Sequence, residues 1–386
     1  MSERPYLDFY DNAGVTPMRQ SVDPQLHAQR RRDLLIQLGV PPGLVRGTNV
    51  LELGCGPGVN AKYLGALSPK TITLVEGSTT GYRALENEWP RHKMSNVTTI
   101  MYNDDILRFA AQPECAGLYD LVICEGVLPW QDNPEKMFRS ICSLVAPGGV
   151  LVVSCLDAIG YLSESVRRAL LPLLAPGYAQ RSVVEVAAQV APAFEPHLAT
   201  IAGRSRAADD WTIDSIIAPM GGKMFPIDQA LQVAEEEGLQ PLGSSPRFLV
   251  DRRWHKAVGG DHATAAQAAY WEHAHWNIDG AFVDPPTRRR NENMLLRGLC
   301  AQVHYSVEDW RRDPDRTNLL PVREAMAAVL NNTAVFGPSH PRVPNALRWY
   351  LDLLTPGTTV EQVASMPDVA RSWFGNGQQY VSFVKL

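Results

Sequence analysis

A strand-like run that ends in three closely spaced glycines constrains this chain more than any other feature. The run VLELGCGPG occupies residues 50–58, with Gly54, Gly56 and Gly58 immediately before a helical pattern. Glycine lets the backbone turn sharply and approach a ligand closely, and the following helix offers unpaired N–H groups. The motif therefore predicts a nucleotide-like cofactor at this turn, although dinucleotide-binding enzymes use the related pattern G-x-G-x-x-G.

Residues 50–155 alternate apolar strand-like runs with amphipathic stretches. The expected strands are VLELG, TITLVEG, VTTIMYND, YDLVICEG and VLVVSC, and the expected helices lie near 59–67, near 79–90 and from about 134. This alternation is typical of parallel strands joined by helices, so we expect a doubly wound, Rossmann-like α/β sheet. The strands are apolar on successive residues, as expected when helices cover both faces of the sheet.

The chain length favours more than one domain, because 386 residues exceed what a single core usually organises. We expect an N-terminal helical lid over residues 1–44, a Rossmann-like cofactor domain over 45–160 and a mainly helical region over 161–386. In that last region, the expected helices lie near 161–174, 181–191, 227–237, 262–274 and 321–331, and the expected strands are FLVDRRWHKAV (248–258) and YVSFVK (380–385).

Composition narrows the class of partner. Lys plus Arg number 36 against 41 Asp plus Glu, a net charge of -5, which disfavours nucleic acid as a substrate. We see neither a signal peptide nor an apolar run long enough to cross a bilayer. The six cysteines are dispersed without a C-x-x-C pair, which indicates reduced thiols rather than a zinc site. We therefore expect a cytoplasmic protein without a metal.

Acidic residues stand at the ends of the predicted strands. Glu52 lies inside the first strand, where a carboxylate is costly without a specific partner. Glu76 ends the second strand about 20 residues beyond the glycines, where a carboxylate accepts from both hydroxyls of a ribose. Asp104 and Asp105 close the third strand, and either could accept a hydrogen bond from an adenine amino group. APGG at 146–149 predicts a tight turn before the fifth strand.

The glycine turn, the acidic end of the second strand, the acidic third strand and the P-G-G turn follow one another in this order. This order resembles the class I methyltransferases that use S-adenosylmethionine, over roughly residues 45–157. The resemblance implies S-adenosylmethionine as cofactor and S-adenosylhomocysteine as product. It places Glu52, Gly54, Gly56 and Gly58 around the amino-acid end of the cofactor, Glu76 at the ribose and Asp105 at the adenine. A dinucleotide dehydrogenase is the disfavoured alternative, because the third glycine comes one position too early and no hydride-transfer constellation follows.

Two carboxylates follow the fourth strand. Glu125 falls at its carboxyl end, where open α/β sheets bind ligands, and Glu135 follows ten residues on. Two carboxylates suit a planar guanidinium, because each accepts a forked pair of N–H bonds. The alternatives are an ion pair of Glu125 with a neighbouring arginine, and a dipole-favoured first-turn position for Glu135 in a helix started by Asn133 and Pro134.

The two glutamates resemble the double-glutamate loop of protein arginine methyltransferases. The segment PYLDFYDNAGVTPMRQ at 5–20 is similar to the aromatic helix with which that family covers its cofactor. This resemblance, over about residues 5–140, implies cofactor contacts for Tyr6 and Tyr10 and matches Met18 to the family's methionine. The loop lacks the family's Trp-Met-Gly-Tyr sequence, its glutamate spacing is one residue longer, and the C-terminal half lacks the strand density of a β-barrel.

Further candidates lie in the C-terminal half. His275 stands among Tyr270, Trp271 and Trp276, within AHW at 274–276, which is similar to the family's Thr-His-Trp loop. It is either a general base or a buried core histidine. Arg247, Arg252 and Arg253 are either carboxylate ligands or solvated surface charges.

We therefore expect a methyltransferase that acts on a small molecule, with Glu125, Glu135 and His275 as the catalytic candidates. The sharper hypothesis is N-methylation of a guanidino compound such as free arginine. The alternatives are an O-methyltransferase of a natural product or glycan, and a non-catalytic S-adenosylmethionine-binding partner subunit. A homodimer is a further expectation from the resemblance.

Overall fold

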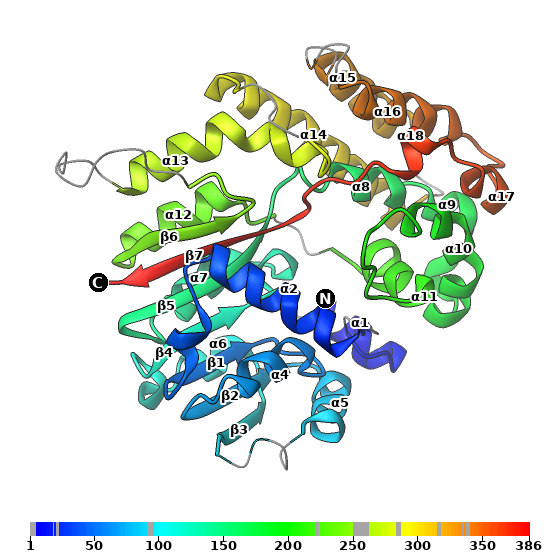
Figure 1. Ribbon diagram of the computed structural model, residues 1–386. Helices are drawn as coiled ribbons and strands as arrows, with labels where there is room; N and C mark the ends of the chain where they lie inside the picture. The colour runs from blue at the N-terminus through cyan, green and yellow to red at the C-terminus, as the bar shows by residue number, and fades with distance from the viewer. Residues whose placement is uncertain are drawn as a thin grey trace. The chain divides into compact units, whose positions relative to one another are not determined.

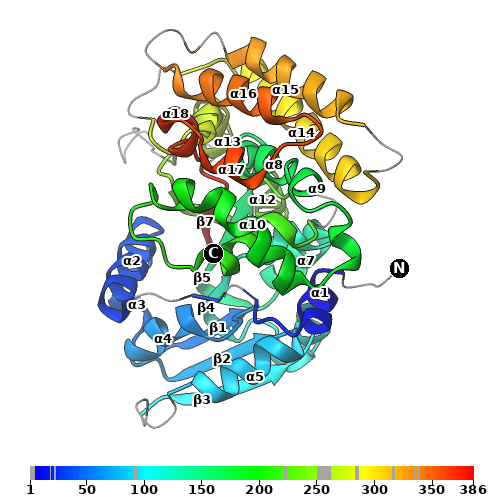
Figure 2. The ribbon, with the colours of Figure 1, turned by 90° about the vertical axis from the view of Figure 1, so that its right-hand side faces the viewer.

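The structure is a computed structural model of the chain, and the chain forms two compact units (Figures 1 and 2). It describes all residues except 1–4, 18, 21–22, 91–93, 95, 221–223, 250–261, 283–286, 315–317, 334–335 and 337–339. The first unit comprises Met1–Leu156, Pro219–Tyr270 and Gln378–Leu386, and the second comprises Asp157–Ala218 and Trp271–Gly377.

The first unit is built on one seven-stranded sheet in the order β3-β2-β1-β4-β5-β7-β6 (Figure 1). Its strands are β1 (Asn49–Leu53), β2 (Thr71–Glu76), β3 (Thr98–Asn103), β4 (Tyr119–Cys124), β5 (Val145–Leu156), β6 (Leu239–Ser245) and β7 (Gln378–Lys385). Strands β1 to β5 are mutually parallel, whereas β7 runs antiparallel to both β5 and β6. The predicted doubly wound α/β fold is confirmed.

Helices cover the sheet because its strands are apolar on both faces. In the first unit they are α1 (Pro5–Ala13), α2 (Pro24–Gln37), α3 (Pro42–Val45), α4 (Val59–Ala66), α5 (Thr79–Glu88), α6 (Ile106–Ala110), α7 (Pro134–Cys142) and α12 (Ile227–Glu236), with short turns η2 (Pro113–Cys115) and η3 (Leu128–Trp130). Leu35 of α2 and Leu64 of α4 join Val50 and Ile123 of the sheet in one buried core. This core fixes the face on which α2 lies.

The predicted APGG turn lies inside a strand. Strand β5 passes through Pro147, Gly148 and Gly149, and its register with β4 shifts between Tyr119 and Leu121. Gly148 has a φ of 76°, and a Cβ on Gly149 would stand 2.8 Å from a backbone oxygen of the same strand. The glycines therefore serve an irregular, closely packed start of the strand rather than a turn before it.

The domain boundaries differ from those predicted from the sequence (45–160 and 161–386). Strand β7 pairs with β5 from Leu156↔Gln378 to Val150↔Val384, and β6 pairs in turn with β7. The sequence identified YVSFVK as a strand but not its partner, because apolar alternation carries no information on pairing. Strand β6 was not predicted, since LQPLGSS is rich in residues of low strand propensity. Phe248 and Leu249 of the predicted strand at 248–258 lie in no strand, and its remaining residues lie outside the described ranges.

The second unit is helical, and its described residues contain no strand. Its elements are α8 (Leu162–Arg168), α9 (Leu171–Leu174), η4 (Tyr178–Gln180), α10 (Val183–Leu198), α11 (Ala208–Thr212), η5 (Ile213–Ile217), η6 (Ala274–Ile278), α14 (Arg290–Arg312), α15 (Leu320–Thr333), α16 (Arg342–Leu353), α17 (Val360–Ala364) and α18 (Asp368–Arg371), while α13 (His262–His273) begins in the first unit. The longest helix, α14, was not predicted. Among the described helices, none is both long and apolar enough to cross a membrane.

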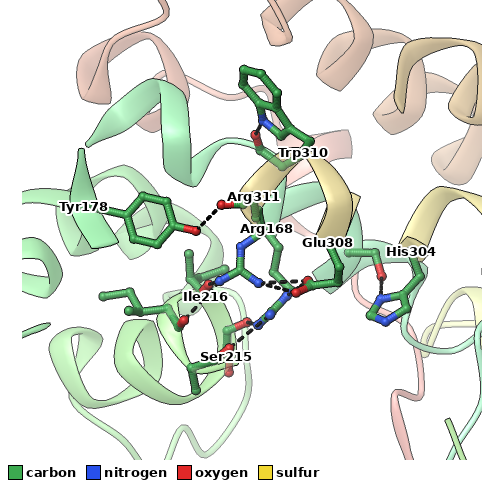
Figure 3. A network of polar contacts seen from close by, with 12 residues as sticks. Arg168, Tyr178, Ser215, Ile216, His304, Glu308, Trp310 and Arg311 are labelled. Carbon is green, nitrogen blue, oxygen red and sulfur yellow. Dashed lines mark hydrogen bonds and ion pairs between the residues drawn. The ribbon is translucent and has the colours of Figure 1, made fainter. Parts of the chain in front are cut away.

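Two buried arginines and a glutamate whose side chain is 17% exposed organise part of the second unit (Figure 3). Glu308 lies between two arginines: Arg168 donates to it at 2.7 Å and Arg311 at 2.8 Å. The terminal nitrogens of the two arginines also donate to carbonyl oxygens at 2.8–3.0 Å. Those carbonyls belong to Ser215, Ile216, Ile217 and Ala218, at the end of η5, which is a π-helical turn. The arginines therefore satisfy carbonyl groups that the helix itself leaves unpaired.

Candidate functional site

The backbone of the glycine turn after β1 favours glycine at all three positions, and at two of them a side chain would also collide with a neighbour. Gly54, Gly56 and Gly58 all have positive φ angles, of 67°, 52° and 75°. A Cβ on Gly54 would stand 2.3 Å from Val127, and one on Gly58 would stand 2.6 Å from Leu85. At Gly56 the nearest atom would be the carbonyl oxygen of Pro17 at 3.7 Å, an ordinary van der Waals contact, so only the positive φ opposes a side chain there. The turn thus presents backbone, without side chains, at the start of α4.

Glu76 connects the end of β2 to this turn. Its carboxylate accepts the N–H of Gly56 and the N–H of Ser78, each at 2.7 Å, and the residue is 4% exposed. Burial raises the pKa of Glu76 and these two N–H groups oppose that rise. A carboxylate has about four acceptor positions, more than these two bonds occupy. The ribose role of Glu76 remains a prediction, and its location beside Gly56 suits that role.

Asp104 and Asp105 both have structural partners. Asp105 is the N-cap of α6, and its Oδ1 accepts from Leu107 N at 2.9 Å and from Arg108 N at 3.3 Å. Asp104 accepts from the N–H of Asp105 at 2.8 Å and pairs with the Arg108 guanidinium. The predicted adenine contact is not tested by these bonds. The second oxygen of Asp105 remains the candidate acceptor.

Helix α1 lies on the ends of β2 and β4. The Tyr6 ring stacks on Trp130, with centroids 5.2 Å apart and planes at 13°, and the Tyr10 hydroxyl donates to the Tyr6 hydroxyl at 3.2 Å. Leu7 packs on Gly77 at the end of β2. The structure therefore places both predicted tyrosines in an aromatic cluster at this edge of the sheet, and their cofactor contact stays a prediction. Met18 lies outside the described residues.

Asp11 holds α1 in place, although the sequence did not single it out. It accepts from the Ser78 hydroxyl at 2.8 Å and from the N–H groups of Thr80 and Thr79 at 3.0 and 3.3 Å. Burial acts to raise the pKa of Asp11, but these hydrogen bonds outweigh it and hold the pKa below the usual value. In the sequence, the only sign of this role is an acidic residue within an aromatic N-terminal helix. The partners of Asp11 lie more than 60 residues away in the sequence, so they could not be read from it.

Glu125 is bound by an arginine of the same chain. Arg31 of α2 donates from both terminal nitrogens to the two carboxylate oxygens, one bond being 2.9 Å long. Asn60 of α4 adds a third hydrogen bond at 3.1 Å. The two charged side chains are only 6% and 7% exposed. The interpretation of Glu125 as a carboxylate awaiting a substrate guanidinium is therefore corrected to the ion-pair alternative.

Glu135 lies in a different ion-pair cluster. It occupies the first turn of α7, whose N-cap is Asn133, and its carboxylate pairs with Arg139 at 2.9 Å. Arg139 also binds Glu236 and Glu237 at the end of α12. Since Glu125 and Glu135 are held by separate arginines, the structure does not join them into a pair that could grip one guanidinium. The helix-start alternative describes Glu135.

His275 is a core histidine of the second unit. It is 1% exposed and stacks on Phe336, with centroids 6.1 Å apart. The amide nitrogen of Asn293 donates to Trp271 O at 2.6 Å and lies 3.2 Å from Nδ1 of His275. Nδ1 is thus the acceptor and the ring proton resides on Nε2. These contacts favour the alternative of a buried core histidine, and the catalytic role of His275 stays an untested prediction. Arg247 is exposed, and Arg252 and Arg253 lie outside the described residues.

Glu52 is the unusual carboxylate of the site. It is 3% exposed within β1, and its Oε2 has no hydrogen-bond partner among the described residues. Burial, reinforced by the nearby Glu125, raises the pKa of Glu52 to about 8, while Arg31 acts against that rise. The sequence predicted that a carboxylate here needs a partner, and the structure leaves one of its oxygens without any.

Comparison with known proteins agrees with this arrangement. Residues 25–187 match a family described as a methyltransferase domain. The match covers less than half of the chain, and this part of the chain is therefore similar to methyltransferase domains. The domain is 32% identical over 111 residues to a ubiquinone biosynthesis O-methyltransferase of Vibrio parahaemolyticus, covering 29% of this chain and 45% of that protein. It is 30% identical over 125 residues to an uncharacterized protein of a Synechococcus strain, covering 32% and 27%. The chain thus spans less than half the length of these relatives.

Among solved structures, the domain resembles PKMT2 of Rickettsia typhi and a putative sarcosine dimethylglycine methyltransferase of Galdieria sulphuraria. The first is 16% identical with a TM-score of 0.44, covering 66% of this chain and 52% of that one. The second is 13% identical with a TM-score of 0.37, covering 92% and 84%.

The cofactor of such a domain is S-adenosylmethionine, and the residues of the turn fit it. The three glycines carry no side chain, so a ligand can approach the backbone of the turn closely. Glu76 keeps acceptor positions for hydroxyl groups, and the unpaired oxygen of Glu52 suits the ammonium group of the cofactor's amino-acid part. The expectation of this cofactor is confirmed at the level of the family.

Proposed function

We propose that the protein transfers a methyl group from S-adenosylmethionine to a small-molecule acceptor. The observation that carries this proposal is the hydrogen bond from Gly56 N–H to Glu76, which joins the glycine turn to the acidic end of the neighbouring strand. The turn lies at the carboxyl edge of a sheet whose strand order reverses beside β1. Ligands of open α/β sheets bind at such a point.

The bound cofactor supplies a methyl group on a positively charged sulfur. The acceptor attacks the methyl carbon in line with the carbon–sulfur bond, and the sulfur is the leaving group. The chain's residues then act mainly by positioning and by excluding water. Glu76 and the backbone around Gly56 would hold the nucleoside. The stacked rings of Tyr6 and Trp130 place apolar surface at the ends of β2 and β4, where it shields the reaction from solvent.

Several features support a small acceptor. The net charge of -5 gives no electrostatic attraction for nucleic acid. The curated relative from Vibrio bears a name that places it in ubiquinone biosynthesis, a small-molecule pathway. All six cysteines are buried and unbridged, which fits the reducing cytoplasm that we propose as the location. A homodimer remains part of the proposal from the resemblance alone.

A hydroxyl acceptor is favoured over a guanidino one. Glu125 and Glu135 were the reason to expect a guanidinium, and both now have arginine partners from the same chain. A guanidino substrate would have to displace Arg31 from a buried, two-point ion pair. The relative named as an O-methyltransferase supports oxygen as the acceptor atom. N-methylation of a guanidino compound such as arginine is therefore the second candidate.

The test is transfer of labelled methyl groups to a panel of phenols, alcohols, amines and guanidines, with Glu76→Ala as the inactive control. We expect label in a hydroxyl compound with the wild-type chain and none with the variant. Label in guanidines alone would restore the second candidate. Binding of the cofactor without transfer to any acceptor would contradict the activity and favour a non-catalytic partner subunit.

A further inference from the structure

Two carboxylates share one buried cation beside the glycine turn. Glu52 in β1 pairs in register with Ile123 in β4, and Glu125 follows that strand two residues later on the same face. Arg31 of α2 lies against this face and binds Glu125. The cluster adjoins the glycine turn, because Asn60, which also binds Glu125, belongs to the first turn of α4.

The partners in this cluster are unequally distributed. Glu125 receives two hydrogen bonds from Arg31 and one from Asn60, whereas Oε2 of Glu52 receives none from the described residues. An ionised carboxylate with an unpaired oxygen is costly at 3% exposure, and a second carboxylate nearby adds to the cost. The neutral acid removes both penalties. The raised pKa of Glu52, about 8, agrees with a carboxyl group that carries its proton at pH 7.

When Glu52 is protonated, the charges around it sum to zero. Helix α2 contributes the cation Arg31 and also His27, whose pKa is lowered by burial and by Arg31, so that it stays uncharged at pH 7. Burial raises the pKa of the thiols of Cys55 and Cys124, which keeps them protonated. Tyr380 of β7 faces Arg31. Arg31 and Glu125 therefore cancel, and ionisation of Glu52 would leave one uncompensated negative charge.

We propose, on the basis of the proposed function, that Glu52 stores a proton which it releases to solvent when the ammonium group of the cofactor's amino-acid part binds. The exchange replaces one positive charge by another, so the cluster stays neutral in both states. The unpaired Oε2 becomes the acceptor for the ammonium N–H groups. Nothing else in the step changes: no other bond is formed or broken, and the proton passes to the buffer.

The test is calorimetric titration of S-adenosylhomocysteine, which carries the same ammonium group, at pH 7 in buffers of different ionisation enthalpy. The dependence of the heat on the buffer gives the number of protons released. We expect about one proton for the wild type, a count that falls as the pH approaches 8, where about half of Glu52 is already ionised. Glu52→Gln should bind more weakly and release none, while the exposed control Glu86→Gln should match the wild type.

Two outcomes would overturn the inference: binding to the wild type without proton release, or the same release from Glu52→Gln. Both leave the proposed function intact, because the cofactor still binds, whereas the absence of any binding heat would contradict the function itself. If the Glu52 variant does not fold, infrared difference spectra of the wild type with and without the ligand test whether Glu52 loses its proton. The carboxylic-acid C=O band should disappear when the ligand is added, and its persistence would contradict the exchange.

Discussion

Arg31 and Glu125 form a two-point ion pair between helix α2 and the end of strand β4, with both side chains more than nine-tenths buried. The sequence led us to expect a guanidinium at Glu125, and a guanidinium is present, but it belongs to the chain. The pair therefore stabilises the packing of α2 on the sheet. It also shapes the electrostatics of the site, since it fixes the charge next to Glu52.

Loss of Arg31 should be strongly destabilising. Arg31→Ala leaves the buried Glu125 without its cation, and breaking a buried pair from one side costs about 3–5 kcal/mol. Arg32→Ala is the matched control, because Arg32 is the next residue of the same helix and its side chain is half exposed. Its effect should stay within about 0.5 kcal/mol. Urea unfolding of both variants measures the difference, and equal stabilities would contradict a structural role for the pair.

Gly54→Ala should damage the turn more than backbone strain alone explains. Both Gly54 and Gly117 have positive φ angles, so alanine at either position incurs about 1–2 kcal/mol of strain. Only at Gly54 does the added methyl group collide, since Val127 would be 2.3 Å away, whereas Gly117 has nothing within 4 Å. We expect Gly54→Ala to lose both thermal stability and binding of S-adenosylhomocysteine. A loss no larger than that of Gly117→Ala would show that the turn can adjust.

Glu76→Gln should weaken cofactor binding while the fold persists. The amide keeps one acceptor oxygen, so only one of the N–H groups of Gly56 and Ser78 keeps its partner. A ribose hydroxyl would lose a hydrogen bond to a charged carboxylate, and such a bond contributes about 1.5–3 kcal/mol, which corresponds to about 10- to 150-fold in the dissociation constant. Glu86→Gln, at an exposed position of α5, should bind like the wild type. Equal affinity of the two variants would remove Glu76 from the binding site.

The second unit should lose stability in mild acid. Burial lowers the pKa of His304 to about 4 from an ordinary value of 6.5, so the unfolded chain binds a proton that the folded chain does not. The free energy of unfolding should therefore fall as the pH decreases from 6.5 to 4, by about 1.4 kcal/mol per pH unit for this group. His304→Asn should flatten that slope, and the exposed control His262→Asn should not. An unchanged slope in His304→Asn would contradict this assignment.

Glu308 adds a second acid-sensitive group at lower pH. Burial acts to raise its pKa, but Arg168 and Arg311 hold the pKa well below its usual range (Figure 3). Its contribution to stability is complete above the ordinary glutamate value of 4.5 and is lost as the pH falls further. Glu308→Gln should be less stable than the wild type at neutral pH, and the difference should shrink in acid. A difference that is independent of pH would contradict the ion-pair origin.

Local patterns predicted the strands and the turn on which the candidate cofactor residues lie. The strands β1 to β5, the glycine turn and the acidic end of β2 follow from short-range sequence, because apolar runs and positive-φ glycines act within a few residues. The hydrogen bond between Gly56 and Glu76 was not predicted, although adjacent parallel strands bring their carboxyl ends together.

Long-range partners could not be predicted in the same way. Arg31 and Glu125 are separated by 94 residues, and only the packing of α2 on the sheet brings them together. The same holds for β7, which pairs with β5 across more than half of the chain. For His275, the sequence could not predict the hydrogen-bond partner. Its residue type suggested a base, but the hydrogen bond from Asn293 decides which ring nitrogen carries the proton.

The most direct test of this account is a calorimetric titration of S-adenosylhomocysteine into the purified wild-type chain. We predict saturable heat with one ligand bound per chain, and a markedly weaker affinity in Glu76→Gln. The absence of heat from a chain that is folded by circular dichroism would contradict the assignment of the glycine turn as a cofactor site.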